Sequence, residues 1–155
     1  MNQVEFEAYW VRAIPEFAQD KVDSGQWAPA DALRLSRESY VEQLPQGLAT
    51  PGNCFFTVRE AASQEGIGML WFAEQERGGK RIAYVYDVAI DAPHQRKGHA
   101  RRAFAALETE VAQRGLTGIA LHVFGHNSGA LSLYEKLGYV PTNITMFKPL
   151  TGSST

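Results

Sequence analysis

The organisation of this chain follows from one stretch, Val88-Ala89-Ile90-Asp91-Ala92-Pro93-His94-Gln95-Arg96-Lys97-Gly98-His99-Ala100. It starts with apolar residues typical of a strand and ends in a basic loop that opens a helical pattern. The first backbone N–H groups of such a helix are unpaired, and the helix dipole adds about half a positive charge there. Gly98 lets the main chain approach an anion closely. The loop is therefore a candidate phosphate site, although a solvated basic helix start would show the same local pattern.

Three strands are predicted before the loop. Short apolar runs rich in aromatic and β-branched residues cover 54–58, 67–73 and 82–90. Glu76-Arg77-Gly78-Gly79-Lys80 lies between the last two runs, and its glycines suit a hairpin turn. The three strands should form an antiparallel meander.

The pattern changes after the loop. A helix is predicted from about 98 to 114, a strand over 119–124, a helix from Asn127 to Gly138, and a last strand over 139–147. A strand, a crossover helix and a strand in this order place the strands around 82–90 and 119–124 parallel. The predicted architecture is α/β, with a mixed central sheet and helices on its faces.

The first fifty residues read as two helices followed by a loop at 45–52. Pro15 interrupts the first helical run, so we expect a kink or a restart there, and Gly25 suits the end of that helix. With 155 residues and 45% apolar residues, the chain fits one domain over 1–150. Residues 151–155 should form a disordered tail.

The composition excludes several classes of protein. Fifteen basic residues against seventeen acidic ones argue against a nucleic-acid binder. A single cysteine, Cys54, excludes a disulfide framework within one chain and fits a reducing cytoplasm. We expect no metal, because the four histidines lack paired ligand spacing. No apolar run approaches the ~20 residues that span a bilayer, and the first residues do not resemble a signal peptide.

Two motifs carry a resemblance to a known family. Gln95-x-x-Gly98-x-Ala100 resembles the acyl-CoA pyrophosphate loop of the GNAT superfamily of N-acetyltransferases. The run from Asn127 to Tyr139 resembles that family's N-x-x-A-x-x-x-Y-x-x-x-G-[FY] signature. The matching blocks are in the family's order over about residues 53–148, the predicted cofactor-binding core, with 1–50 as a helical acceptor-side segment.

The resemblance implies a fold and a set of binding residues. The sheet should be mostly antiparallel, and its one parallel pair should splay apart to admit the pantetheine arm of acetyl-CoA. Main-chain groups of Val88, Ala89 and Ile90 would bind that arm, with Asn127 and Ala130 on its far side. The pyrophosphate would lie on the N–H groups of Gln95, Arg96, Lys97, Gly98, His99 and Ala100. Tyr134 would lie beside the thioester sulfur.

One departure from the family concerns the start of the chain. Most members begin with a strand, whereas this sequence goes almost directly into a helical pattern, so the first strand is predicted to be truncated. The sheet edge left by it allows a homodimer or a covering loop.

Direct attack of an amine on the thioester needs a base and an acid. Tyr134 is the predicted acid, which would protonate the departing thiolate. Asp87 is the predicted base, with a side chain pointing opposite to both its neighbours; His122 and His126 are alternatives. The residues expected to contact the acceptor are Trp71, Tyr86, His122 and Phe124. Cys54 is interpreted as structural.

The predicted function is transfer of an acetyl group from acetyl-CoA to a primary amine of a small molecule or peptide. An alternative is an acyl-CoA-binding sensor or partner module without turnover. A doubly wound nucleotide-binding fold is disfavoured, because antiparallel strands precede the loop and G-x-G-x-x-G is absent.

Overall fold

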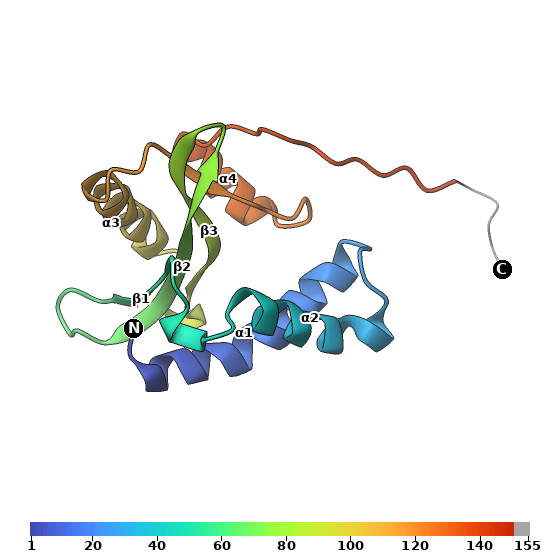
Figure 1. The fold of residues 1–155 in the computed structure, drawn as a ribbon, viewed down its shortest axis with the longest axis horizontal. Helices are drawn as coiled ribbons and strands as arrows, with labels where there is room; N and C mark the ends of the chain where they lie inside the picture. Colours follow the sequence, from blue (N-terminus) through green and yellow to red (C-terminus); the bar gives the residue numbers. More distant parts are fainter. Residues whose placement is uncertain (151–155) are drawn as a thin grey trace.

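A four-stranded mixed sheet forms the centre of the structure, a computed structural model that describes residues 1–150 (Figure 1). The strands are β1 (Asn53–Arg59), β2 (Gly66–Arg77), β3 (Lys80–Ile90) and β4 (Ile119–Leu121), in the spatial order β1-β2-β3-β4. The first three are antiparallel, whereas β3 and β4 are parallel. The predicted mixed α/β fold is confirmed. No strand precedes the first helix in the described part of the chain.

Within residues 1–150, four helices cover the sheet through two apolar clusters. The helices are α1 (Gln3–Asp23), α2 (Pro29–Gln43), α3 (His99–Gln113) and α4 (Ser128–Lys136), and 3-10 turns occupy Gly47–Ala49 and Ala92–His94. One cluster packs α1 and α2 on side chains such as Phe55 and Trp71, and Figure 1 shows these two helices side by side. The other packs α3, with part of α4, on Leu70 and Phe72. Side chains alternate along β2, so the clusters lie on opposite faces.

Helix α1 runs through Pro15 as one element, so the predicted restart there is wrong. Pro15 faces solvent, while its neighbours Ala13 and Ile14 are buried. Tertiary packing of the apolar face outweighs the lost backbone hydrogen bond. A capping box at Asn2 starts the helix, and Gly25 follows its end with φ of +72°, as predicted.

A β-bulge interrupts the β2–β3 ladder opposite Trp71 and Phe72. Trp71 faces Asp87 and Phe72 faces Val85, so Tyr86 is an extra residue on β3. Tyr86 stacks on Trp71, and Asp87 hydrogen-bonds Tyr9 of α1. Both side chains therefore lie on the α1 face of the sheet. The prediction that Asp87 points opposite to both neighbours is wrong for Tyr86, because strict alternation fails at a bulge.

Strand β4 is shorter than predicted and leaves β3 early. The parallel pairing covers only Ala83–Val85 of β3 against Ile119–Leu121, although β3 continues to Ile90. The predicted strand over 119–124 ends at Leu121. The second half of β3 is therefore paired with β2 alone in the described residues, directly after the bulge.

The last predicted strand, over 139–147, is wrong. Residues 139–150 form no helix or strand, and Figure 1 shows this segment running away from the sheet. An apolar alternating sequence specifies a strand only where a neighbouring strand accepts its hydrogen bonds. The predicted disordered tail, 151–155, lies outside the described residues.

A prediction concerns Gly68, where β2 comes close to β3. A Cβ atom added at Gly68 would lie 2.3 Å from the carbonyl oxygen of Ala89. We expect Gly68→Ala to push β3 aside and lower the free energy of unfolding by about 1–3 kcal/mol. Gly118→Ala is the matched control, since its added Cβ would have no neighbour closer than 3.8 Å. Equal denaturant midpoints for the two variants would contradict the close packing at Gly68.

Candidate active site

The loop before α3 has the backbone geometry of an anion site. Gly98 has φ of +81° and is the N-cap of α3, and Arg96 also has a left-handed φ of +60°. No side chain caps the helix, so its first N–H groups stay free for a ligand. The first intrahelical bond runs from the Arg102 N–H to the Gly98 carbonyl at 3.1 Å. Successive N–H groups in such a turn form a concave surface that suits phosphate oxygens.

Two side chains hold this loop in shape without a ligand. The Arg102 guanidinium donates to the Lys97 carbonyl at 3.1 Å and lies 3.0 Å from His99 Nδ1. From the other side, Gln95 Nε2 donates to the Ile90 carbonyl at 2.8 Å. Gln95 thereby ties the loop to the end of β3. The fixed position of these groups lowers the entropy that a ligand would lose on binding.

The predicted pantetheine-binding residues lie in the part of β3 that is no longer paired with β4. Val88, Ala89 and Ile90 pair with Leu70, Met69 and Gly68 of β2. Their other side receives no strand from the described residues, because β4 pairs no further than Val85. Backbone groups on that side can bind an extended ligand as if it were another strand.

The start of α4 holds the other two predicted cofactor residues. Asn127 is the N-cap, and its Oδ1 accepts the Ala130 N–H at 3.2 Å. Ala130 and Tyr134 are four residues apart and so lie on one face of the helix. That face joins the second apolar cluster through Tyr134.

Tyr134 has the environment of a proton donor. Its ring packs edge-on against Phe104, with 5.5 Å between centroids. Burial, and then the charge of Asp87, raises the pKa of Tyr134 to about 12. The hydroxyl makes no hydrogen bond with the described part of the protein, so it is free to meet a substrate atom and stays protonated at neutral pH.

Asp87 lies on the face of the sheet opposite to that of Tyr134. Tyr9 Oη donates to Asp87 Oδ2 at 2.9 Å, and Tyr9 belongs to the α1 cluster. Burial raises the pKa of Asp87, which the hydrogen bond from Tyr9 only partly offsets. The charge of Asp87 also raises the pKa of Tyr134, although the two side chains pack on opposite faces of the sheet.

The predicted acceptor-binding residues divide into one core side chain and three partly accessible ones. Trp71 is only 3% exposed and donates from Nε1 to Asn53 Oδ1 at 2.8 Å, so it is a core side chain that an acceptor cannot contact directly. Tyr86 stacks on it at 4.6 Å and is 38% exposed. His122 and Phe124 pack edge to face at 4.9 Å just after β4. Burial, with the Lys21 charge second, lowers the pKa of His122.

Sequence reasoning missed the tyrosines that accompany Asp87. Tyr9 donates to Asp87, and its oxygen lies 3.5 Å from that of Tyr40 on α2. These contacts join residues 31 and 78 positions apart in sequence, so no local motif marks them. The helical period of α1 predicts an inward face, but not what that face meets. His126, the other alternative base, lies 3.4 Å from Asp20 on the surface.

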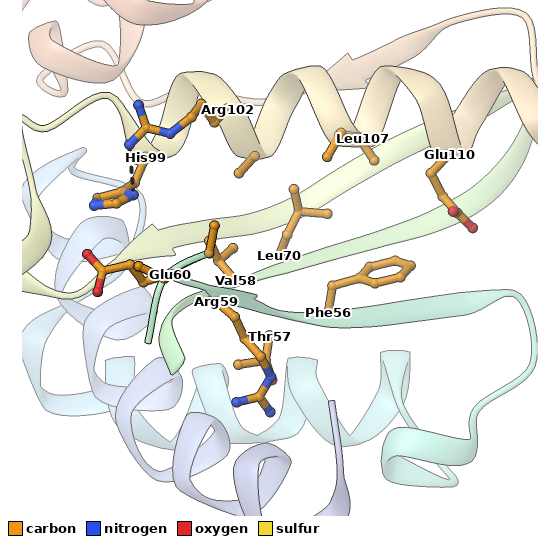
Figure 2. Close-up of a pocket in the computed structure, with 14 residues that line it drawn as sticks. Phe56, Thr57, Val58, Arg59, Glu60, Leu70, His99, Arg102, Leu107 and Glu110 are labelled. Atoms are coloured by element: carbon orange, nitrogen blue, oxygen red, sulfur yellow. Dashed lines mark hydrogen bonds between the residues drawn. The ribbon is translucent and has the colours of Figure 1, made fainter. Parts of the chain in front are cut away.

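A groove of about 690 Å³ lies on the far side of α3 from α4 (Figure 2). Figure 2 shows Leu107 and Glu110 of α3 above Phe56 and Leu70 of β1 and β2. His99 and Arg102 at the start of α3 also line this groove, but its strands are on the opposite side of β3 from β4. It is therefore separate from the cleft predicted from sequence.

One cluster next to the loop has side chains that bind metals in other proteins. Donor atoms of Glu60, His94 and His99 lie within 4.8 Å of one another, a grouping that sequence spacing did not reveal. The Arg102 guanidinium lies against His99, and its positive charge opposes a cation there. The absence of a metal therefore stays a prediction.

Comparisons with known proteins agree with this geometry. A family model described as "Acetyltransferase (GNAT) family" matches residues 19–139. An uncharacterized N-acetyltransferase of Bacillus subtilis (strain 168), YycN, is 33% identical over 150 residues, which are 97% of this chain and 96% of YycN. Another from the same organism, YdgE, is 31% identical over 150 residues, 97% of this chain and 95% of YdgE. The fold also matches the crystal structure of YycN with a TM-score of 0.91. The match covers 97% of this chain and 95% of the YycN chain.

A mixed sheet that opens between β3 and β4, with a loop of anion-site geometry before α3, matches the acetyltransferase fold of these relatives. With the family model and the YycN relationship, the chain belongs to the GNAT acetyltransferase family. A mycothiol acetyltransferase of Amycolatopsis mediterranei is 38% identical over 90 residues, 55% of this chain and 29% of that protein. Among residues 1–150, no helix combines the length and the apolar composition needed to cross a membrane.

Proposed function

We propose that this protein transfers the acetyl group of acetyl-CoA to a primary amine of a small molecule or peptide, by direct attack in a ternary complex. The observation that carries the proposal is the parting of β3 from β4 after Val85, which leaves one side of Val88–Ile90 open just before the Gly98 loop. Asp87 and Tyr134 pack on opposite faces of the sheet, and we expect their side chains to reach this gap from those two faces. A ligand lying in the gap would meet a carboxylate on one side and a phenol on the other.

The chain's own groups would hold acetyl-CoA in two places. The N–H groups from Gln95 to Ala100 would bind the diphosphate, with the dipole of α3 favouring its charge. The open side of Val88–Ile90 would bind the pantetheine amides. The thioester carbonyl would then lie near the bulge, where a main-chain N–H of β3 could stabilise a developing oxyanion.

The acceptor would enter from the face of α1 and α2. An amine with a pKa near 10.4 is neutral in only about one molecule in 2,500 at pH 7, a handicap of roughly 4.6 kcal/mol. A base whose pKa lies close to neutrality offsets part of it. Burial moves the pKa of Asp87 in that direction, and Asp87 lies on the acceptor face. Asp87 is therefore the preferred base, with His122 the alternative.

The thiolate would leave on the face of α3 and α4. Tyr134 is on that face with a free hydroxyl and a pKa raised to about 12. Its proton would pass to the sulfur as the bond between carbon and sulfur breaks. In this mechanism the amine would lose its proton on the α1 face of the sheet, and the thiolate would gain a proton on the α3 and α4 face.

A thiol-release assay tests the function. The protein is mixed with acetyl-CoA and a panel of amines that includes polyamines, amino sugars, lysine peptides and N-terminal peptides. Cys54, the only cysteine of the chain, contributes at most one background thiol per protein. We expect at least one amine to give turnover and an acetylated product by mass spectrometry. Binding of acetyl-CoA by calorimetry, without release above background for any amine, would favour the sensor module instead.

A second prediction follows from the pKa of Asp87. Burial raises this pKa above its ordinary 3.8, so the folded protein binds the proton more tightly than the unfolded chain. Ionised Asp87 therefore lowers stability at neutral pH, and this loss disappears at low pH, where both states are protonated. We expect Asp87→Asn to raise Tm at pH 7 while lowering turnover, and the gain in Tm to shrink as the pH falls to 3.8 and below.

Melting curves from about pH 3 to 8 check this prediction, since they span the ordinary carboxyl range. Asp31→Asn is the control, because Asp31 is a surface residue of α2 with a 54% exposed side chain. A gain in Tm for Asp87→Asn that is the same at every pH would show that the carboxyl charge is not its cause.

A further inference from the structure

Lys21, near the end of α1, has its ammonium enclosed by three aromatic rings. Its Nζ lies 5.4 Å from the ring centroid of Phe17, 5.5 Å from that of Trp27 and 5.7 Å from that of Phe124. Phe17 belongs to α1, Trp27 lies between α1 and α2, and Phe124 follows β4. The ring faces attract the positive charge, as does the C-terminal end of α1. Lys21 therefore stays a cation at neutral pH, although burial lowers its pKa.

This cation forms no salt bridge within residues 1–150. An ammonium has three donors, and one of those on Lys21 goes to Gln26 Oε1 at 2.8 Å. Gln26 is held in turn, because its Nε2 donates to Ser24 Oγ at 3.0 Å. Asp20, the acid next to Lys21 in sequence, lies 3.4 Å from His126 instead. The described residues thus leave two donors of a fixed, partly buried cation free for an anion.

The contacts of α1 put Lys21 on the acceptor side of the proposed cleft. Phe124, one of its three rings, packs edge to face with His122, with 4.9 Å between centroids, and both residues are expected to contact the acceptor. The same helix holds the proposed base, because Tyr9 donates to Asp87 at 2.9 Å. Tyr9 and Lys21 are twelve residues apart, or about 18 Å along the helix. An acceptor lying along α1 would therefore meet Asp87 at one end and an unpaired cation at the other.

We propose that Lys21 binds an anionic group of the acceptor, a carboxylate or a phosphate, so that the acceptor is an extended amine with a negative charge at its other end. The inference rests on the proposed function and names its substrate class. The anion would accept the two free donors of Nζ, and the three rings would exclude water from the ion pair, which strengthens it.

The reaction itself would be unchanged by this contact. The bond between nitrogen and the acetyl carbon forms, and the bond between that carbon and sulfur breaks. The amine proton passes to Asp87, and the Tyr134 proton passes to the sulfur. Lys21 would fix the far end of the acceptor, so its contribution should appear mainly in KM for anionic acceptors.

Matched pairs of acceptors test the proposal on the full chain, with thiol release from acetyl-CoA as the readout. ε-Aminocaproate is compared with its neutral amide, and aminohexyl phosphate with aminohexanol. We expect kcat/KM to be about 10–100-fold higher for the anionic member of at least one pair, as expected for hydrogen bonds to a charged group. A preference in the first pair alone identifies a carboxylate, and one in the second pair alone a phosphate. Equal values within both pairs would overturn this inference and leave the proposed function standing, whereas no turnover with any amine would overturn both.

Variants of Lys21 assign the preference to this residue. Lys21→Met keeps an apolar stem of similar length between the rings but removes the charge. We expect it to lower kcat/KM for the preferred anionic acceptor by about 10–100-fold and to change that for the neutral member of the pair by less than about twofold. Lys21→Arg should recover most of the loss, and Lys80→Met, at an exposed lysine of the β2–β3 hairpin, should behave as wild type. Equal losses for both members of the pair in Lys21→Met would show that Lys21 only supports the fold, and would overturn the proposal.

Discussion

Replacing Gly98 by glutamate is expected to abolish measurable binding of acetyl-CoA, with a loss of at least about 100-fold in affinity, or roughly 2.8 kcal/mol. Gly98 has φ of +81°, where a residue with a Cβ is strained by roughly 1–2 kcal/mol. The added carboxylate would also lie at the helix N-terminus, where it would repel the diphosphate by a further ~1–4 kcal/mol at about 4 Å. Calorimetry with coenzyme A measures the effect.

Gly115→Glu is the matched control for this experiment. Gly115 follows the other end of α3 with φ of +70°, and nothing lies within 4 Å of an added Cβ there. The substitution therefore adds the same charge in a similar left-handed conformation, far from the loop. We expect it to lower stability but to keep the wild-type affinity. Unchanged affinity in Gly98→Glu, or equal losses in both variants, would place the diphosphate elsewhere.

Replacing Tyr134 by phenylalanine is expected to lower kcat by about 100-fold, because general acid catalysis contributes roughly 10²–10⁴-fold. The edge-on contact with Phe104 does not need the hydroxyl, so the affinity for coenzyme A should stay within about twofold. Tyr139→Phe is the matched control. Its ring lies 5.8 Å from that of Tyr134 in the same cluster, but its hydroxyl is buried in a different groove.

The pH profile gives a second readout for Tyr134. Burial and then the charge of Asp87 raise its pKa to about 12, so the acid stays protonated well above neutrality. We expect the wild-type kcat to show no loss from Tyr134 up to about pH 10, the ordinary pKa of tyrosine. Equal kcat in wild type and Tyr134→Phe across the profile would remove Tyr134 from the mechanism.

The proposed mechanism depends on the opening of the sheet, which would let one cleft serve two substrates. The bulge at Tyr86 places Tyr86 and Asp87 together on the α1 face, and the β3–β4 pairing ends at Val85, just before it. A closed ladder would separate the two faces completely. In the proposed mechanism, the opening of the sheet at this point would let Asp87 and Tyr134 act on one reacting centre from opposite faces.

Local sequence predicted the elements that local interactions fix. The hairpin glycines, the periodic apolar runs and the basic loop at Gly98 predicted β1, β3 and α3 to within two residues of their ends, whereas β2 runs four residues past its predicted end at Ala73. The bulge escaped prediction because its extra residue, Tyr86, is an ordinary strand former. Gly68 escaped too, since the close approach to Ala89 depends on a second strand. The Tyr9–Asp87 bond joins distant segments, and no local pattern signals it.

The wrong prediction of a strand over 139–147 has a different cause. The alternation of Val140, Ile144 and Met146 does favour a strand, but the body of the same chain supplies no partner for it. A sequence pattern indicates which residues of an extended segment share a face. It does not indicate which strand the segment pairs with.

A crystal structure of the protein with coenzyme A is the most direct test of the central claim. We predict the diphosphate within hydrogen-bond distance of the main-chain N–H groups from Gln95 to Ala100, and the pantetheine arm along the open side of Val88–Ile90. The sulfur should lie within reach of the Tyr134 hydroxyl. A diphosphate bound in the groove between α3 and β1, or on any surface away from Gly98, would contradict the account.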